Sequence, residues 1–199
     1  ENGNRGDNEL IGNPSAPNTL DGRQGFDTLV GGTAADTYAF GIGYDFDRII
    51  ETGSGTEDRV VFGEGVTLDQ LQLRRDGLDL LIDLGNGEDV LRIVNGLGTT
   101  AVETFSFADG TSLSISEIRA RLLIGDDSSE RIVGFSSIAD ILDGGRGDDQ
   151  LEGGSGKLAG QSYEVLETYR MFADDRGWNR SLEEAVRTGL TAEAAVDRL

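Results

Sequence analysis

The sequence contains no cysteine and no histidine among its 199 residues. Without cysteine, neither disulfide bonds nor thiolate metal sites can form. Without histidine, the chain cannot build a histidine-ligated zinc site or a Ser-His-Asp catalytic triad. These two absences exclude the common zinc sites and one large class of hydrolases.

Basic residues are scarce as well. The chain has 17 Lys and Arg against 37 Asp and Glu, which gives a formal net charge of −20. Such a charge would repel the phosphates of a nucleic acid, so we expect no nucleic-acid partner. No apolar run approaches the roughly 18 residues of a membrane span, so none is expected. The acidity indicates either a solvated tail or a protein that binds cations.

Glycine, in contrast, is abundant, and it is unevenly distributed. The chain has 30 glycines, of which residues 157–199 hold 3, and residues 1–156 hold 29 of the 37 acidic residues. The composition therefore predicts two parts of different character, with the border near Lys157-Leu158.

The glycine-rich part follows a nine-residue template, G-G-x-G-x-D-x-U-x, in which U is a large apolar residue. Residues 144–152 (GGRGDDQLE) fit every position, with Asp149 sixth and Leu151 eighth. Residues 31–39 place Asp36 sixth, and residues 22–30 place Asp27 sixth. Weaker copies have the following residues at the sixth position: Asn8, Asn18, Asp47, Asp58, Glu130 and Asp140.

This pattern has a direct chemical meaning. Glycines allow a tight turn and let main-chain carbonyls crowd inward, while the carboxylate at position six points at the same spot. Carboxylate and carbonyl oxygens at a flexible turn suit Ca²⁺. The predicted calcium ligands are Asn8, Asn18, Gly22, Gly25, Asp27, Gly31, Asp36, Asp47, Asp58, Glu130, Asp140, Gly144, Gly147 and Asp149.

Each turn supplies only part of a coordination shell, so turns two repeats apart are expected to share an ion. The expected groups are Asn8, Asp27 and Asp47 on one side, Asn18, Asp36 and Asp58 on the other, and Glu130 with Asp149 near the end. Asp140 would need a partner in a following copy. The alternative is a disordered glycine-rich linker, but an apolar residue two places after each acid favours the repeat.

The repeats resemble the RTX family, the haemolysin-type calcium-binding repeats, over residues 1–61 and 125–156. This resemblance implies a parallel β-roll that binds Ca²⁺. Asn8, Asn18 and Glu130 depart from the family's aspartate at position six. Asp27 and Asp149 are among the three best candidates, together with Asp36.

The middle of the chain, residues 62–124, loses the nine-residue period. Alternating segments separated by turns at Asp76-Gly77, residues 85–88 and Asp109-Gly110 predict a small antiparallel sheet region. The stretch from Ser114 to Glu117 reads as a capping box that opens a helix through Leu123. FGEGV (62–66), DGLDLLIDL (76–84) and FADGT (107–111) resemble the haemolysin-type calcium-binding-related domain.

Four carboxylates in this region, those of Asp79, Asp83, Glu88 and Asp89, could be read as a glycoside-hydrolase acid pair. The sequence offers no substrate-stacking aromatic residues beside them, so we expect solvated strand and turn residues instead.

From Gln161 the pattern becomes helical, and a helical hairpin with a short third piece is expected. Residues 169–199 resemble the helical subdomain of Enzyme I of the phosphoenolpyruvate phosphotransferase system, but phosphotransfer through histidine is not available without histidine. Three interpretations stay open: a fusion with its seam at Lys157-Leu158, an uncleaved C-terminal secretion signal, or a helical cap on the repeats. Leu166, Phe172, Trp178 and Leu182 are expected to form a small apolar cluster.

The expected fold is mainly β: a parallel β-roll (1–61 and 125–156) flanks an antiparallel region with a short helix (62–124), followed by a helical tail (157–199). The expected function is a non-enzymatic calcium-binding module of a secreted bacterial protein. The RTX resemblance implies export by a type I secretion machinery and folding on extracellular Ca²⁺. We expect a monomer. The alternatives are an accessory module of an extracellular lipase, protease or polysaccharide epimerase, and a segment of an adhesin or surface layer.

Overall fold

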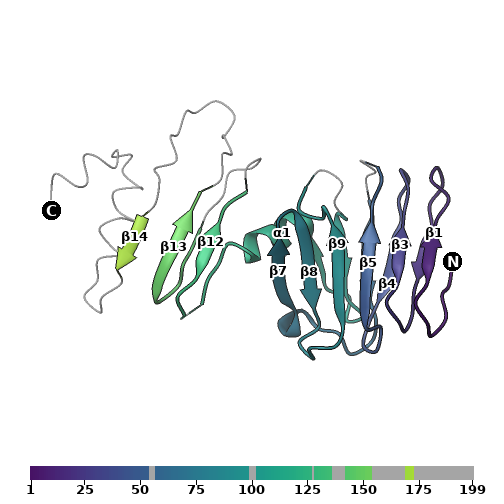
Figure 1. The fold of residues 1–199 in the computed structure, drawn as a ribbon, viewed down its shortest axis with the longest axis horizontal. Coiled ribbons are helices and arrows are strands. Elements are labelled where there is room, and N and C mark those ends of the chain that lie inside the picture. The colour runs from purple at the N-terminus through teal and green to yellow at the C-terminus, as the bar shows by residue number, and fades with distance from the viewer. Residues whose placement is uncertain (54–56, 99–101, 127, 136–141, 154–168, 173–199) are drawn as a thin grey trace. The chain divides into compact units, whose positions relative to one another are not determined.

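The computed structural model describes residues 1–53, 57–98, 102–126, 128–135 and 142–153, and the backbone of 169–172. The chain forms two compact units, Glu1–Leu122 and Leu123–Leu199. Within the described residues nearly all elements of both units are β-strands, which confirms the mainly β part of the predicted fold class (Figure 1). No helix in these ranges is long and apolar enough to cross a membrane.

The first six strands of the first unit alternate between two sheets, and within each sheet neighbouring strands run parallel. One sheet contains β1 (Glu9–Ile11), β3 (Thr28–Val30) and β5 (Phe46–Ile50). The other contains β2 (Thr19–Asp21), β4 (Thr37–Phe40) and β6 (Arg59–Phe62). Each repeat copy thus supplies one short strand, and copies two apart become neighbours.

In the first unit, the apolar residue two places after position six is buried from the second copy onward. Leu29 and Ile49 in one sheet, and Leu20, Tyr38 and Val60 in the other, have no exposed surface. The core is thin, because each three- to five-residue strand turns only alternate side chains to the same face and so buries one or two large residues, such as Tyr38 and Phe40 of β4.

The middle of the chain extends these same two sheets. It contributes a 3₁₀ turn, η1 (Leu68–Gln70), and the strands β7 (Gln72–Asp76), β8 (Asp79–Asp83), β9 (Val90–Val94), β10 (Thr104–Ser106) and β11 (Ser112–Ser114). The predicted antiparallel pairs β7–β8, β8–β9 and β10–β11 are present. In addition, β9 pairs in parallel with β5, and β10 with β6.

The helix α1 (Ile115–Arg121) begins at the predicted capping box. The Glu117 N–H donates to Ser114 Oγ at 3.3 Å, and the Ser114 N–H donates to the Glu117 carboxylate at 2.7 Å. This reciprocal pair satisfies two backbone donors that a helix start leaves free. The helix ends slightly before the predicted Leu123.

In the second unit, β12 (Arg131–Val133) and β13 (Asp148–Glu152) run parallel, and β14 (Tyr169–Phe172) pairs antiparallel with β13. The predicted helix is therefore wrong over 169–172. The physical reason is that an edge strand presents unpaired N–H and C=O groups, which a later segment can pair with regardless of its local periodicity. The other predicted tail helices and the apolar cluster lie outside the described residues.

Candidate metal centre

One group of position-six residues lies beside the sheet formed by β1, β3 and β5. The Asn8 N–H donates to Asp27 Oδ1 at 2.7 Å, and the Asp27 N–H donates to Asp47 Oδ1 at 3.1 Å. The strand register places the same residues opposite one another, since Glu9 pairs with Thr28 and Thr28 with Arg48. The structure therefore brings Asn8, Asp27 and Asp47 together in a column, which we call the first acid column.

A second acid column accompanies β2, β4 and β6. The Asn18 N–H donates to Asp36 Oδ1 at 2.8 Å, and the Asp36 N–H donates to Asp58 Oδ1 at 2.7 Å. The column continues beyond the repeats, because the Asp58 N–H donates to Glu103 Oε2 at 2.7 Å. Glu103 was not among the predicted ligands.

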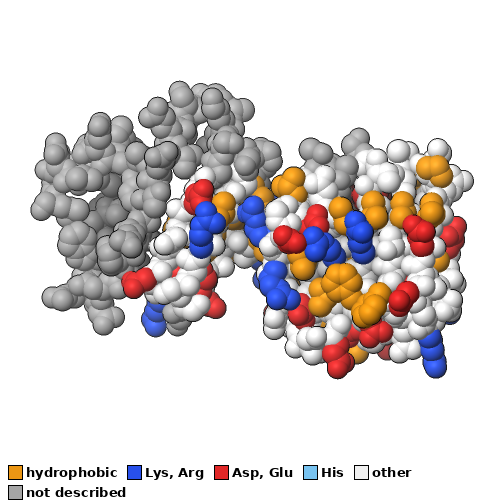
Figure 2. All heavy atoms as spheres, viewed as in Figure 1, with side chains coloured by type: hydrophobic (Ala, Val, Ile, Leu, Met, Phe, Trp, Pro, Cys, Tyr) orange, Lys and Arg blue, Asp and Glu red, His pale blue; other side chains and the backbone are white. Residues whose placement is uncertain are grey.

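The aspartates of both columns are withdrawn from water. Asp27, Asp36, Asp47 and Asp58 are each at most 1% exposed. The arginine ion pairs recorded between described residues fall on other carboxylates, those of Asp21, Asp76, Asp79, Asp83 and Glu152. Figure 2 likewise shows arginines and acidic side chains interspersed on the surface of the first unit. The buried columns hold a negative charge that no recorded arginine pair neutralises.

Two atoms of the first column have no partner at all. Asp27 Oδ2 and Asp47 Oδ2 are buried and make no hydrogen bond. An ionised carboxylate oxygen in this position is strongly destabilising unless a cation or a proton joins it. These two atoms are therefore the place where the structure most clearly fits a bound cation.

The pKa values of these carboxylates reflect the same cost of burying a negative charge. Burial, together with the charges of Asp27, Asp45 and Asp21, raises the pKa of Asp47 to about 8. Burial also raises the pKa of Asp27, and it raises that of Asp58 with a contribution from neighbouring carboxylates. Removing these carboxylates from water disfavours their charged form.

The first glycine of each copy closes against the residue at position six. A Cβ atom added at Gly31 would lie 2.7 Å from Asp36 Oδ2, and one at Gly144 would lie 2.6 Å from Asp149 Oδ2. A Cβ at Gly22 would overlap Asp27 Oδ2 in the same way. At Gly22 and Gly144 the carboxylate is the nearest group, and at Gly31 the Tyr38 hydroxyl lies closer still, so these positions exclude residues with a Cβ atom.

The glycine at position four, present in the copies that begin at Gly22 and Gly144, has a different role. Gly25 and Gly147 have φ values of +127° and +116°, a backbone region that residues with a Cβ atom rarely adopt. These glycines allow the chain to turn tightly between one strand and the next.

The second unit repeats the arrangement once. The Glu130 N–H donates to Asp149 Oδ1 at 3.0 Å, Asp149 is 7% exposed, and Glu130 Oε2 is buried without a partner. Glu130 and Asp149 are thus brought together as expected. Asp140 lies outside the described residues.

Asp89 was expected to be solvated, and this prediction is wrong: the side chain is 2% exposed, and Asp83 is 7% exposed. Asp89 stands opposite Asp45, two residues away from the first acid column, because Val90 pairs with Phe46. Its carboxylate accepts hydrogen bonds from the N–H groups of Gly43 and Asp45 at 2.9 and 2.8 Å and from the Asn86 side chain at 2.6 Å.

These donors distinguish Asp89 from Asp27 and Asp47 of the first acid column, each of which has an unpartnered oxygen. Burial by itself raises the pKa of Asp89, but the hydrogen bonds from Gly43, Asn86 and Asp45 outweigh it and lower the pKa. Protein donors satisfy this carboxylate, so it needs no cation.

The sequence did contain a signal for Asp89 and Glu103. Each is followed two places later by a fully buried apolar residue, Leu91 and Phe105, as the repeat acids are. The signal was hidden because each acid lies more than 40 residues from its strand partner in the repeats instead of about 20.

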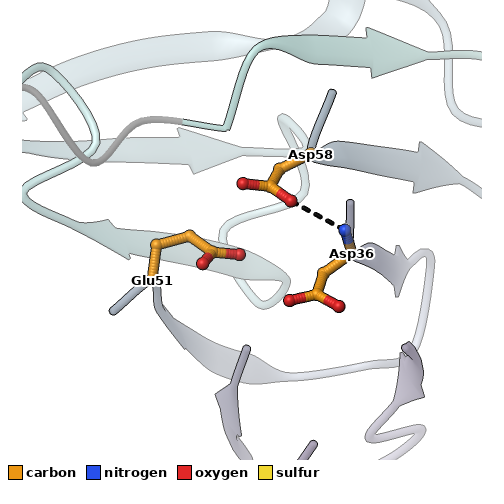
Figure 3. A group of neighbouring side chains, drawn as sticks. All are labelled: Asp36, Glu51 and Asp58. Carbon is orange, nitrogen blue, oxygen red and sulfur yellow. Dashed lines mark hydrogen bonds between the residues drawn. The ribbon is translucent and has the colours of Figure 1, made fainter. Parts of the chain in front are cut away.

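Glu51 is a further buried acid that the template did not identify. Asp36, Glu51 and Asp58 offer carboxylate oxygens that all lie within 4.8 Å of one another (Figure 3). The Tyr38 hydroxyl donates to Glu51 Oε1, while Oε2 is buried without a partner. Burial raises the pKa of Glu51 to about 7, although the hydrogen bond from Tyr38 opposes the rise.

Comparison with known proteins gives two family matches. Residues 79–117 match the haemolysin-type calcium binding protein related domain. Residues 145–199 match the family described as PEP-utilising enzyme, N-terminal. The first match confirms the resemblance seen in the middle of the chain. The second agrees with a PEP-utilising enzyme resemblance of the tail and begins inside the repeat copy 144–152.

A curated relative is the iron-regulated protein FrpA of Neisseria meningitidis serogroup C, which is 30% identical over 119 residues. The aligned part is 56% of this chain and 11% of the relative, so the chain spans about a tenth of that protein's length. Together with the first family match, this similarity supports a calcium-binding module of the haemolysin type. The matched domain contains Asp89 and Glu103.

Proposed function

We propose that this chain is a calcium-binding RTX module whose folding is coupled to Ca²⁺ binding. The observation that carries the proposal is the pair of buried oxygens without partners, Asp27 Oδ2 and Asp47 Oδ2. A cation between such groups offsets both the burial and the mutual repulsion of the carboxylates.

The donor chemistry selects the ion. The chain has neither cysteine nor histidine, so carboxylate, amide and carbonyl oxygens are the available ligands. Hard oxygen ligands on flexible turns suit Ca²⁺, which accepts six to eight of them in variable geometry. The residues proposed to hold calcium ions are Asn8, Asn18, Gly22, Gly25, Asp27, Gly31, Asp36, Asp47, Asp58, Glu130, Asp140, Gly144, Gly147 and Asp149.

Calcium would act on this chain mainly by folding it. Residues 1–156 have a net charge of about −18, and each short repeat strand buries only one or two large side chains. The metal-free chain therefore repels itself and has little apolar burial to oppose chain entropy. Binding only the native state stabilises that state by mass action. The alternating parallel strands of the first unit would then form the β-roll of the RTX family.

This behaviour would suit a protein that is exported unfolded. Extracellular calcium modules bind with dissociation constants of about 10⁻⁴–10⁻³ M. At low cytosolic Ca²⁺ the module would stay unfolded for a type I secretion machinery, and it would fold outside the cell as a monomeric, non-catalytic part of a longer protein.

The test is a calcium titration of the full chain, followed by far-UV circular dichroism and calorimetry. We expect a change from coil to β spectrum at millimolar Ca²⁺ that a chelator reverses. D27N should require more Ca²⁺, whereas E64Q, which removes an exposed charge, should behave like the wild type. A β spectrum that is independent of Ca²⁺ would refute the proposal.

The match of residues 145–199 to a PEP-utilising enzyme favours a second candidate for the tail, a segment of a different protein family joined to the calcium module. No histidine is present to carry phosphate. Calorimetry on chains with and without residues 157–199 tests this candidate. An unchanged number of calcium ions indicates a merely attached tail, and a loss of sites indicates a tail that completes the second unit.

A further inference from the structure

Glu51 occupies a place in the fold where the repeat has a glycine. The register of β1, β3 and β5 aligns Ile11 with Val30, and Val30 with Ile50. The residues that follow these three are Gly12, Gly31 and Glu51. This turn therefore has a glutamate at the position where the other two turns have a glycine.

The Glu51 side chain turns toward the second acid column and not toward water. It is 7% exposed, and Figure 3 shows its carboxylate directed at those of Asp36 and Asp58. One carboxylate oxygen from each of the three residues lies within 4.8 Å of the other two. This distance allows one cation to contact all three carboxylates.

The existing hydrogen bonds leave part of this cluster free. Asp36 Oδ1 accepts from the Asn18 N–H and side-chain amide, and Asp36 Oδ2 accepts from the Gly32 N–H at 2.7 Å. Glu51 Oε1 accepts from Tyr38, but Glu51 Oε2, buried in the same cluster, has no partner. The unpartnered oxygen is an independent sign that the cluster is completed by something other than protein.

Tyr38 makes this turn different from the other repeat copies. It stands at position eight, where the copies beginning at Gly22 and Gly144 have leucine. Its ring is fully buried, and its hydroxyl reaches the turn and holds Glu51. An aliphatic residue could fill the core equally well, but it could not orient a carboxylate.

We propose that Asp36, Glu51 and Asp58 form a three-carboxylate site for a divalent cation, with Tyr38 as the residue that positions Glu51. This inference rests on the proposed calcium function, because Asp36 and Asp58 belong to the second acid column. It adds a ligand outside the repeat motif. With three anionic side chains, the site binds Ca²⁺ more tightly than the turns that carry Asn8 and Asn18.

The first test is calorimetric titration of the full chain with Ca²⁺ at one fixed pH, comparing the wild type, E51Q and E64Q. E51Q keeps the size of the side chain and an acceptor for Tyr38, but it lacks the charge. We expect it to lose one site or to weaken that site at least tenfold, with E64Q unchanged. Wild-type titration without binding would refute the proposed function itself. Wild-type binding with E51Q unchanged would overturn only the three-carboxylate site.

A second test does not depend on how E51Q folds. Tb³⁺ added to the wild-type chain should emit on tyrosine excitation, since the Tyr38 hydroxyl contacts a proposed ligand. Y38F should remove most of this emission at saturating Tb³⁺, and Ca²⁺ should displace it from the wild type. Y44F is the matched control, because the Tyr44 hydroxyl contacts Asp21 and not Glu51. Equal emission from the wild type and Y38F would overturn the proposal.

Discussion

The Asp27 N–H donates to Asp47 Oδ1, although the two residues are 20 positions apart in the sequence. Both side chains are buried, and the second carboxylate oxygen of each is without a partner. A backbone donor thus aligns two acids that would repel each other when both are ionised. Replacing an aspartate of this pair by asparagine should therefore stabilise the metal-free fold but weaken calcium binding.

D47N should stabilise the metal-free chain and weaken its response to calcium. Without Ca²⁺ the substitution removes a group that folding must either protonate or bury as a charge, so more β signal should remain in chelator than for the wild type, with a gain of about 1–3 kcal/mol. With Ca²⁺ it removes a proposed ligand charge, so the calcium concentration at half-maximal folding should rise at least tenfold. Far-UV circular dichroism over a calcium titration measures both. Effects of equal sign in the two conditions would contradict a role for Asp47 in holding calcium.

The metal-free chain should be more folded at pH 5 than at pH 9. The pKa of Asp47 is raised from 3.8 to about 8, and that of Glu51 from 4.5 to about 7. A group with a raised pKa in the folded state contributes stability that is fully present below its unfolded value and is lost as pH rises through the folded value. Each tenfold difference in proton affinity between the folded and unfolded states corresponds to about 1.4 kcal/mol of stability at most. Circular dichroism of metal-stripped protein across this range checks the direction.

The double variant D47N/E51Q is the control for that pH dependence. It lacks the two groups with the largest raised pKa values among the described carboxylates, so its metal-free signal should change much less between pH 5 and 9. Asp89 and Asp79, whose pKa values are lowered, lose their contribution only as pH falls through values below 3.8. They therefore do not act in this window.

D89N should lower stability without changing the number of bound calcium ions. The Asp89 carboxylate receives hydrogen bonds from Gly43, Asp45 and Asn86, and an amide would turn a donor toward one of these donors. Urea unfolding at saturating Ca²⁺ should show a loss of about 1–3 kcal/mol. Calorimetry should count as many ions as in the wild type. A lost calcium site would instead place Asp89 among the ligands.

The sequence predicted the parts of this structure that local patterns control. Asp27 and Asp36, each two residues before a buried apolar side chain, indicated parallel strands and the acid columns. Gly77, with φ of +62°, marked the hairpin between β7 and β8. These features need only a turn of known length and an alternating strand, so spacing is sufficient to predict them.

Other features depend on pairings that no local period encodes. Asp89 and Glu103 join strands more than 40 residues away, and the intervening hairpins interrupt the repeat. Glu51 occupies a glycine position, so a template based on glycine treats it as a mismatch. The strand β14 forms against the edge of β13, and its own helical periodicity does not indicate a strand.

G22A should impair calcium-dependent folding because the added Cβ atom crowds the Asp27 carboxylate. This effect should exceed the change that any glycine-to-alanine substitution makes in the freedom of the unfolded chain. A Cβ atom at Gly22 would overlap Asp27 Oδ2 and lie 2.7 Å from Asp27 Cβ. The Asp27 carboxylate would have to move away from the turn, and we expect the calcium concentration at half-maximal folding to rise at least tenfold, which corresponds to about 1.4 kcal/mol.

G6A provides the matched control for G22A. The nearest atom to an added Cβ at Gly6 is Asn4 Oδ1 at 3.5 Å, an ordinary contact. Both substitutions reduce the freedom of the unfolded chain to a similar extent, so only the crowding of Asp27 differs between them. If G6A and G22A shift the calcium response equally, the close approach of Gly22 to the carboxylate does not matter for binding. A shift confined to G22A shows that the glycine keeps space open for the Asp27 carboxylate.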